Sequence, residues 1–362
     1  MTVEGKSSSA GPGYHAFVVE FLDRLAERHN TAWQWRKIAA SDADGVEECD
    51  ETGFAVDRDF ERLQREMALV HRAICQSALE HFEDENPILL NMPIGFAPDY
   101  PDGLYGALSP LGPMSPDQLR WRCGLEEDAE LLAAAADYFP WWDNGFGEDF
   151  FAGLALHALW MTVPWTTPRH EGDERLYELV VGWGRRAETH ESGSRVPSAA
   201  LVDVETLAGS TLPPTVPDLE GTGYLRRLFR RDTGGGWSLQ VPGSCEISLE
   251  DDATTTLFGL SDFAVRFSSL TARRTPECVA APSETGPRSE AIFEQADLSG
   301  EVSPPKPGIE DGFVIHAEAR VSTDPTTEEV AILTVWYDRS DLQALAENVA
   351  RSLRHDTWRA GA

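Results

Sequence analysis

Lysine is nearly absent from this chain of 362 residues, and acidic side chains outnumber basic ones by two to one. The only lysines are Lys6, Lys37 and Lys306, and 61 aspartates and glutamates against 30 lysines and arginines leave a formal net charge of -31. Phosphate contacts need clustered Lys and Arg, and the field of so acidic a molecule opposes the approach of a polyanion. The composition therefore argues against nucleic-acid binding by a broad basic face.

The excess of carboxylates indicates the salt conditions in which the protein is folded, and it gives no indication of a catalytic or binding activity. Self-repulsion at this charge destabilises a compact state, and about 1 M salt screens it by shortening the Debye length to about 3 Å. We interpret the charge as the adaptation of a cytoplasmic, halophilic protein, or as the mark of a GC-rich genome that favours Arg over Lys. In a second interpretation the carboxylates imitate the phosphates of DNA and inhibit a DNA-binding protein.

Cysteine and long apolar runs are also scarce. Five cysteines are scattered without a C-x-x-C pair, which argues against a disulfide framework or a structural zinc site and fits a reducing cytoplasm. The start of the chain has no apolar segment of the kind found in a signal peptide. The longest apolar run, 150–163, is too short to cross a bilayer and contains His157, so it predicts a buried helix and no membrane association.

No complete catalytic motif occurs in the sequence. G-x-S-x-G, H-E-x-x-H and the EF-hand loop are missing, so the commonest nucleophilic and metal-assisted hydrolyses lack support. His316 and Glu318 have the H-x-E spacing of zinc deaminases, but no cysteine follows Cys278 to complete such a site. His71 and Cys75 stand one helical turn apart, and two ligands do not make a metal site. We assign no metal and no cofactor.

Hydrophobic periodicity predicts an α+β fold: a helical N-terminal half, then a mixed domain with an antiparallel sheet and a C-terminal helix. Ser115, followed by a proline and by Gln118, is the clearest helix start because it has the spacing of a capping box. The predicted boundaries are a flexible tail at 1–13, a mainly helical domain at 14–195, a β-rich segment with a short Arg-rich helix at 196–273, a linker or long loop at 274–308, and a β-hairpin with a C-terminal helix at 309–362 that packs with 196–273.

The segment 138–151 combines aromatic side chains with carboxylates. Trp141 and Trp142 lie in a predicted loop, and stacking aromatic rings next to paired carboxylates are what a sugar-cleaving cleft needs. In this interpretation the Trp pair stacks on the ligand and the catalytic residues are Asp143, Glu148, Asp149 and His157. The other interpretation is that the Trp pair fills a junction between helices and the acids stabilise a helix start.

The segment 224–231, YLRRLFRR, holds the densest positive charge of the chain. The expected helix would carry an apolar stripe flanked by arginines, and Arg is enriched at contact sites because its planar fork pairs with carboxylates and stacks on rings. The candidate interaction residues are Tyr224, Arg226, Arg227, Phe229, Arg230 and Arg231. The acidic partner could be another protein or this protein's own N-terminal half, and an internal ion-pair network is the alternative.

These observations favour a non-catalytic function. We expect a soluble intracellular interaction or assembly protein with a protein partner, in which the Arg-rich helix and the Pro/Gly-rich segment 86–114 form contact surfaces. The alternatives are a hydrolase acting on a polar or carbohydrate-like substrate through the Trp-rich loop, and the acidic DNA mimic. The sequence leaves the oligomeric state open.

Overall fold

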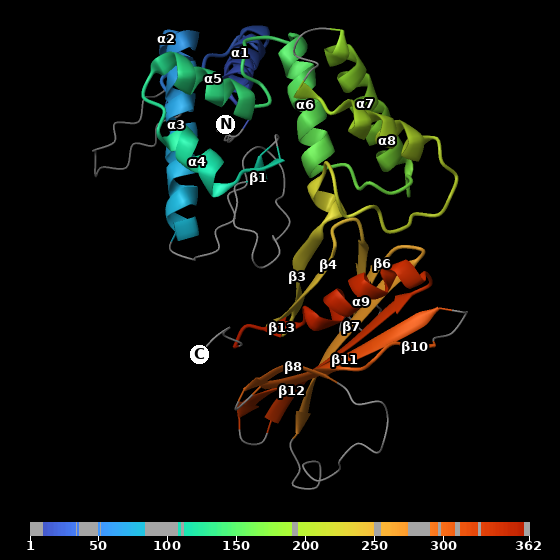
Figure 1. The fold of residues 1–362 in the computed structure, drawn as a ribbon. Coiled ribbons are helices and arrows are strands. Elements are labelled where there is room, and N and C mark those ends of the chain that lie inside the picture. The colour runs from blue at the N-terminus through green and yellow to red at the C-terminus, as the bar shows by residue number, and fades with distance from the viewer. Residues whose placement is uncertain are drawn as a thin grey trace.

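The computed structural model describes residues 10–33, 35, 50, 52–83, 108–109, 112–189, 195–249, 255–273, 290–295, 298–307, 312–324 and 327–357. Helices form one half of the molecule and β-strands the other, with the last helix lying against the sheet (Figure 1). The predicted α+β fold is therefore confirmed, including the order of its two halves along the chain.

The helical half is built from eight described α-helices and one short strand pair. The helices are α1 (Pro12–Arg28), α2 (Phe54–Asp57), α3 (Phe60–Glu83), α4 (Pro116–Cys123), α5 (Asp128–Tyr138), α6 (Glu148–Met161), α7 (Glu171–Glu188) and α8 (Ser198–Ala208), and the strands are β1 (Leu108–Ser109) and β2 (Gly112–Pro113). Most of the predicted segment 86–114 lies outside the described residues. Helix α1 begins at Pro12, inside the predicted tail, because proline suits a first helical position.

Local capping chemistry places two of these helix starts. The Ser115 hydroxyl accepts from the backbone N–H of Gln118, and the Gln118 side chain accepts from the backbone N–H of Ser115, so the capping box predicted for α4 is present. Asp59 accepts from the backbone N–H of Arg62 and caps α3 in the same way. Each contact satisfies a backbone group that the first helical turn leaves unpaired.

Two separate apolar cores stabilise the helices. One lies among α1–α5 and includes Leu63, Tyr138 and Phe139, and the other lies among α6–α8. Gly184 of α7 allows the close approach of Leu201 of α8, since a Cβ at Gly184 would lie 2.5 Å from a Leu201 methyl carbon. Helix α8 therefore belongs to the helical half, which extends to Ala208 and not to the predicted boundary at 195.

The described residues of the second half form two antiparallel sheets. The strands are β3 (Leu228–Gly234), β4 (Trp237–Pro242), β5 (Glu246–Leu249), β6 (Thr255–Gly259), β7 (Phe263–Arg273), β8 (Glu290–Gln295), β9 (Leu298–Val302), β10 (Lys306–Pro307), β11 (Phe313–Asp324), β12 (Thr327–Tyr337) and β13 (Arg354–His355). The larger sheet has the order β5-β6-β7-β12-β11-β9-β8, with β10 beside β11, and the smaller has the order β13-β4-β3. The predicted hairpin of the C-terminal segment is formed by β11 and β12.

Alternation of buried and less buried residues over parts of the long strands creates the core of this half. On β7, Phe263, Val265 and Phe267 are buried and face the same side as Val335 and Leu333 of β12, their neighbours in register. Helix α9 (Gln343–Arg351) contacts β11, β12 and β4, and its buried residues join the same core. Buried residues of the larger sheet and of α9 thus share one apolar core, and α9 lies against the sheet (Figure 1).

Two predictions about this half are wrong. The segment 274–308, predicted as a linker or long loop, contains β8, β9 and β10 within its described residues. Backbone pairing of β9 and β10 with β11, and of β8 with β9, can hold these strands without apolar alternation. The segment 224–231 is not a helix: a short 3-10 turn, Tyr224–Arg226, is followed by β3. Pairing of β3 with β4 through a turn of three positive-φ glycines, 234–236, buries Phe229 and overrides the local helical pattern.

The two halves are joined at Tyr224. Its buried hydroxyl donates to the carbonyl of Ser109 and accepts from the Ser109 N–H, at 3.0 Å in both cases. Its ring packs on Trp160 of α6 with 5.0 Å between ring centroids. The strand pair β1–β2, the end of α6 and the start of the β-half are therefore tied to one side chain. Among the described residues, no helix is both long and apolar enough to cross a membrane.

Candidate protein-contact site

The loop between α5 and α6 is fixed by the start of α1. The Trp141 backbone N–H donates to the carbonyl of Ala10 at 3.0 Å, and the Trp141 carbonyl accepts from the N–H of Gly13 at 3.0 Å. The approach is so close that a Cβ at Gly13 would lie 2.1 Å from the Asp143 carbonyl oxygen. From the α6 side, a Cβ at Gly153 would lie 1.9 Å from the Pro140 oxygen. Glycine at these two positions lets three chain segments meet.

The Trp141 side chain is a packing residue. Only 7% of it is exposed, its ring lies 4.3 Å from Phe150 and 5.3 Å from Phe17 between centroids, and its indole N–H donates to the Gly145 carbonyl at 2.7 Å. Trp142 is half-buried and stacks on Phe139 at 6.1 Å. The burial of Trp141 and the stacking of Trp142 on Phe139 weigh against the predicted stacking on a sugar and favour the interpretation that the Trp pair fills a junction between helices.

A continuous cluster of aromatic rings extends from Trp141 to the surface. Phe17 lies 5.5 Å from Phe146 and 6.3 Å from Phe21, and Phe146 lies 5.1 Å from Phe150. Phe21 is 53% exposed and Phe146 is 54% exposed. We call Phe17, Phe21, Trp141, Phe146 and Phe150 the aromatic patch. It brings α1 together with the loop before α6, and its outer rings face solvent.

The predicted catalytic carboxylates lie close to Phe146 and Phe150 in the sequence. Asp143 precedes Phe146, whereas Glu148 and Asp149 occupy the first turn of α6, and all three are exposed. The pKa of Asp143 is raised above its ordinary value by burial and by the nearby charge of Asp149. A hydrogen bond from Gln64 lowers it and only partly offsets these two effects. His157 is eight residues beyond Asp149 on the same helix, a rise of about 12 Å, so the structure does not bring it to these carboxylates.

The sequence predicted the carboxylates but missed the exposed aromatic residues beside them. Phe17 and Phe21 are four residues apart, so they lie on one face of a helix. This spacing does not tell whether that face is buried in the core or exposed at the surface. Phe146, which stands between two glycines in an acidic loop, has no core periodicity, and that is the one signal in the sequence that could have indicated an exposed ring.

The Arg-rich segment is held inside the molecule. Arg226 is 8% exposed, donates to the Asp203 carboxylate at 2.8 Å and lies 4.0 Å from the centre of the Trp165 ring. Arg230 donates to the Ser238 hydroxyl and to the Ser352 carbonyl. Of the remaining candidate residues, Tyr224 and Phe229 are fully buried, and Arg227 and Arg231 are half-buried. These contacts favour the internal network over an exposed docking helix.

Replacing Arg226 with lysine is expected to lower the free energy of unfolding by about 1–2 kcal/mol, because lysine keeps the charge but loses the planar stacking on Trp165. The measurement is urea denaturation followed by circular dichroism. Arg175→Lys is the control, since Arg175 forms an exposed pair with Glu178 and its replacement should leave the midpoint unchanged. Equal midpoints for both variants would contradict an internal role for Arg226.

The other sequence candidates have structural partners. The His316 ring nitrogen lies 3.1 Å from the Thr334 hydroxyl across β11 and β12, and Glu318 pairs with Arg320. His71 and Cys75 are buried in contact in the core of α1–α5, where burial lowers the pKa of His71 to about 3 and raises that of Cys75 to about 12. Over the described part of the chain, no three His, Cys, Asp or Glu side chains gather as a metal site.

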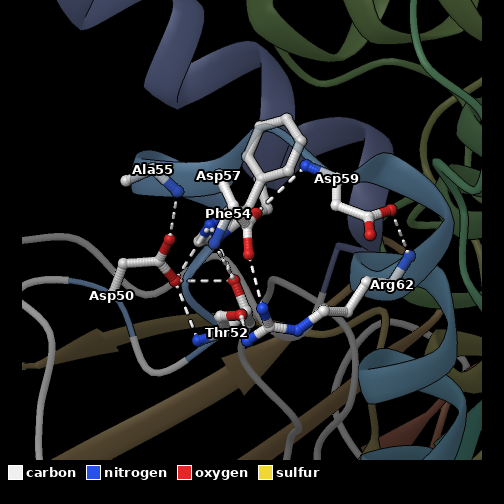
Figure 2. Close-up of polar contacts among 8 residues, drawn as sticks. Asp50, Thr52, Phe54, Ala55, Asp57, Asp59 and Arg62 are labelled. Carbon is white, nitrogen blue, oxygen red and sulfur yellow. Dashed lines mark hydrogen bonds and ion pairs between the residues drawn. The ribbon is translucent and has the colours of Figure 1, made fainter.

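A buried carboxylate that sequence reasoning missed orders the chain before α3. Asp50, 5% exposed, accepts from the backbone N–H and hydroxyl of Thr52 and from the N–H of Ala55 (Figure 2). It also lies 3.3 Å from a ring nitrogen of His15 on α1. Burial opposes its charge, but the hydrogen bonds from His15, Thr52 and Ala55 outweigh burial and hold the pKa of Asp50 well below its usual range.

The same segment is tied to α3 by arginine. Arg62 pairs with Asp57 and donates to the Thr52 carbonyl at 3.0 Å, while the N–H of Asp59 donates to Asp57 (Figure 2). Asp50 and Arg62 therefore fix α2 between α1 and α3 from its two sides. The arrangement positions α1, and so Phe17 and Phe21, and its polar groups are engaged with one another.

Ion pairs occupy some of the remaining carboxylates. Glu205 pairs with Arg185, and Glu328 with Arg320. A mimic of DNA needs rows of free carboxylates in place of phosphates. Pairing with arginine removes these carboxylates from such rows.

The comparisons with known proteins leave this geometry as the only guide to function. No protein-family model matches the chain, and no curated protein matches its sequence. The class that the fold defines is an α+β protein with a helical first half, and the site of most interest on it is the aromatic patch.

Proposed function

We propose that this chain is a protein-interaction protein and that the aromatic patch is its contact surface. The observation that carries the proposal is the pair of rings, Phe21 and Phe146, that stay more than half exposed although each packs on Phe17. Exposed apolar clusters rimmed by polar residues mark interaction sites, and aromatic side chains are enriched in the centres of such sites. Acidic side chains at 143, 148 and 149 provide the polar rim.

The carbohydrate-hydrolase alternative has less support. A glycosidase needs two carboxyl groups across an open cleft and rings on which the sugar can lie. Here Trp141 is covered by neighbouring aromatic side chains, and Trp142 lies on Phe139. The three carboxylates are exposed and adjoin the aromatic residues in the sequence, where they suit a polar rim. We therefore assign the patch to protein contact and not to catalysis.

The Phe21→Ala/Phe146→Ala double variant is expected to lose at least tenfold in capture of its partner while it stays folded, with a loss of stability far smaller than that loss of binding. A central aromatic contact is worth about 2 kcal/mol or more, and exposed rings contribute little to folding. The experiment compares wild type and variant as baits in native lysate at molar salt, with captured proteins identified by mass spectrometry. Leu212→Ala, at the most exposed apolar side chain of the described residues, is the matched control.

Two outcomes of this capture experiment would overturn the proposal. In the first, the wild-type chain is recovered alone. In the second, the same proteins bind the wild type and the double variant equally well. Urea denaturation of each bait shows that any loss of capture comes from the surface and not from unfolding.

A further inference from the structure

The larger sheet ends at a strand that is exposed over its whole length. Strand β5 pairs with β6 on one side and has no described neighbour on its other side. All four of its residues, Glu246–Leu249, are exposed. Alternate residues of such an edge strand direct their backbone N–H and C=O groups away from the sheet. The edge of β5 therefore offers a row of backbone groups to which a further strand can pair.

Two large apolar side chains lie on one face of this edge. Ile247 is 49% exposed and Leu249 is 67% exposed. In the register of β5 with β6, Ile247 lies opposite Phe258 and Leu249 lies opposite Thr256. Phe258 belongs to the apolar core of the sheet, and residues directly opposite each other share a face. The core face of the sheet therefore continues to its edge, where it ends in two exposed aliphatic side chains.

The other described sheet edges carry features that oppose the addition of a strand. At the far end of the larger sheet, the pairing of β8 with β9 has a register shift between Ala291 and Phe293. Strand β10 consists only of Lys306 and Pro307, β13 has two residues, and β3 carries three consecutive charged residues at 230–232. Bulges, charges, prolines and very short strands are the usual means of blocking an edge. In β5 the register is unbroken and the last three residues are uncharged.

The edge of β5 is complementary to a second copy of itself. In an antiparallel pair of two β5 strands centred on Ser248, positions equally distant from the centre lie opposite each other. Ile247 of each copy then faces Leu249 of the other, and all four aliphatic side chains share the face that carries the core of each sheet. A two-fold axis at Ser248 also meets the condition of a symmetric dimer, in which one patch serves both copies.

We propose that β5 joins two copies of this chain, so that their larger sheets become one continuous antiparallel sheet. This interface goes beyond the proposed function and does not depend on it, because none of the residues of β5 belongs to the aromatic patch. The net charge of -31 on each copy opposes association, and molar salt screens that repulsion. A strand of four residues gives a small contact area, so the dimer dissociates reversibly.

Sedimentation velocity of the full chain measures this association. In molar KCl the wild type should shift from monomer to dimer as its concentration rises through the micromolar range, and the dimer fraction should fall when the salt is lowered to about 0.15 M. Ile247→Thr/Leu249→Thr should weaken dimerisation at least tenfold, because threonine keeps the strand propensity and removes the apolar contact. The matched control is Leu270→Thr/Ile332→Thr, at exposed residues of the inner strands β7 and β12, and it should change dimerisation less than twofold.

A cysteine at the two-fold axis tests the register of the pair. Ser248→Cys sets two thiols directly opposite each other, with about 5 Å between their Cβ atoms, so a disulfide can join the copies. Glu246→Cys is the control on the same strand, and it lies about 14 Å from its counterpart because four strand positions separate the two. After oxidation, non-reducing electrophoresis should show a linked dimer for Ser248→Cys and only the background of the wild-type cysteines for Glu246→Cys.

Three results would overturn the inference. The first is a wild-type chain that stays monomeric at every concentration in molar salt, which would leave the edge of β5 to a strand of another protein. The second is equal dimerisation of the wild type and Ile247→Thr/Leu249→Thr, which would place the dimer contact elsewhere. The third is equal disulfide formation by Ser248→Cys and Glu246→Cys. Circular dichroism shows that each variant is folded, and the cysteine test stands if the threonine variant is not.

The dimer and the aromatic patch can fail separately. Phe21→Ala/Phe146→Ala should dimerise as the wild type does, because its substitutions lie in the helical half. Loss of dimerisation in that variant would show that the aromatic patch, and not β5, joins the two copies.

Discussion

Replacing Trp141 with alanine is expected to lower the free energy of unfolding by about 3–5 kcal/mol, the cost typical of removing a large buried ring. The indole packs against Tyr14, Phe17, Phe146 and Phe150, so its loss opens a cavity where α1, the α5–α6 loop and α6 meet. It also removes the hydrogen bond to Gly145. Because most domains have only about 5–15 kcal/mol of stability, this one change could remove a third of it or more.

Urea denaturation followed by circular dichroism measures this effect without relying on the fluorescence of the missing indole. Trp121→Ala is the matched control, since Trp121 is largely exposed and its loss should cost no more than about 0.5 kcal/mol. If Trp141 served to stack a ligand and did not pack the core, Trp141→Ala would unfold at the wild-type midpoint. That result would return the Trp-rich loop to the list of binding clefts.

Replacing Asp50 with asparagine is expected to cost about 2–3 kcal/mol at neutral pH. Hydrogen bonds to a charged acceptor contribute about 1.5–3 kcal/mol, and the amide group of asparagine would point N–H donors at the donors of Thr52 or Ala55. His15 on α1 would lose its carboxylate partner at the same time. The segment around α2 and its contact with α1 should therefore loosen together.

The pH dependence of this loss has a defined sign. The pKa of Asp50 is lower in the folded state than its ordinary value of 3.8, so its stabilisation is complete above that value. Stability is lost as the pH falls below about 4, because the unfolded chain binds a proton that the folded chain resists. The difference between wild type and Asp50→Asn should shrink over the same range. The control is Asp117→Asn, since Asp117 forms an exposed pair with Arg120. The stability difference between wild type and this control should not change over the same pH range.

A difference between wild type and Asp50→Asn that stays constant from neutral pH to pH 3 would contradict this account of Asp50. The experiment is a series of urea denaturations at fixed ionic strength. Fixed salt matters because the net charge of -31 makes the whole molecule sensitive to screening.

Local sequence chemistry determined much of the helical half and of the long strands. Two helix starts depend on residues within one helical turn, namely the capping box at Ser115 and the cap at Asp59. The long strands depend on the alternation of apolar residues along β7, β11 and β12. Both kinds of signal can be read directly along the chain. The order of helices before strands follows from where these patterns occur. No knowledge of long-range contacts was needed for them.

Tertiary contacts decided the outcome where local patterns conflict or are weak. The segment 224–231 has a helical stripe of apolar residues, yet pairing with β4 and burial of Phe229 made residues 228–231 part of a strand. Strands β8 and β9 carry little apolar alternation and depend on backbone pairing in the larger sheet. Both outcomes required partners distant in the sequence, which no local window contains.

For the candidate site, too, the sequence determined one part and the tertiary structure decided the other. The sequence by itself determined that carboxylates and aromatic residues share the segment 138–151, since composition is local. Only the tertiary structure decided that Trp141 is buried and that Phe21 and Phe146 are exposed beside Phe17. Whether a ring is buried depends on which other segments pack against it, and the contact of α1 with the loop before α6 is made by residues more than 120 positions apart.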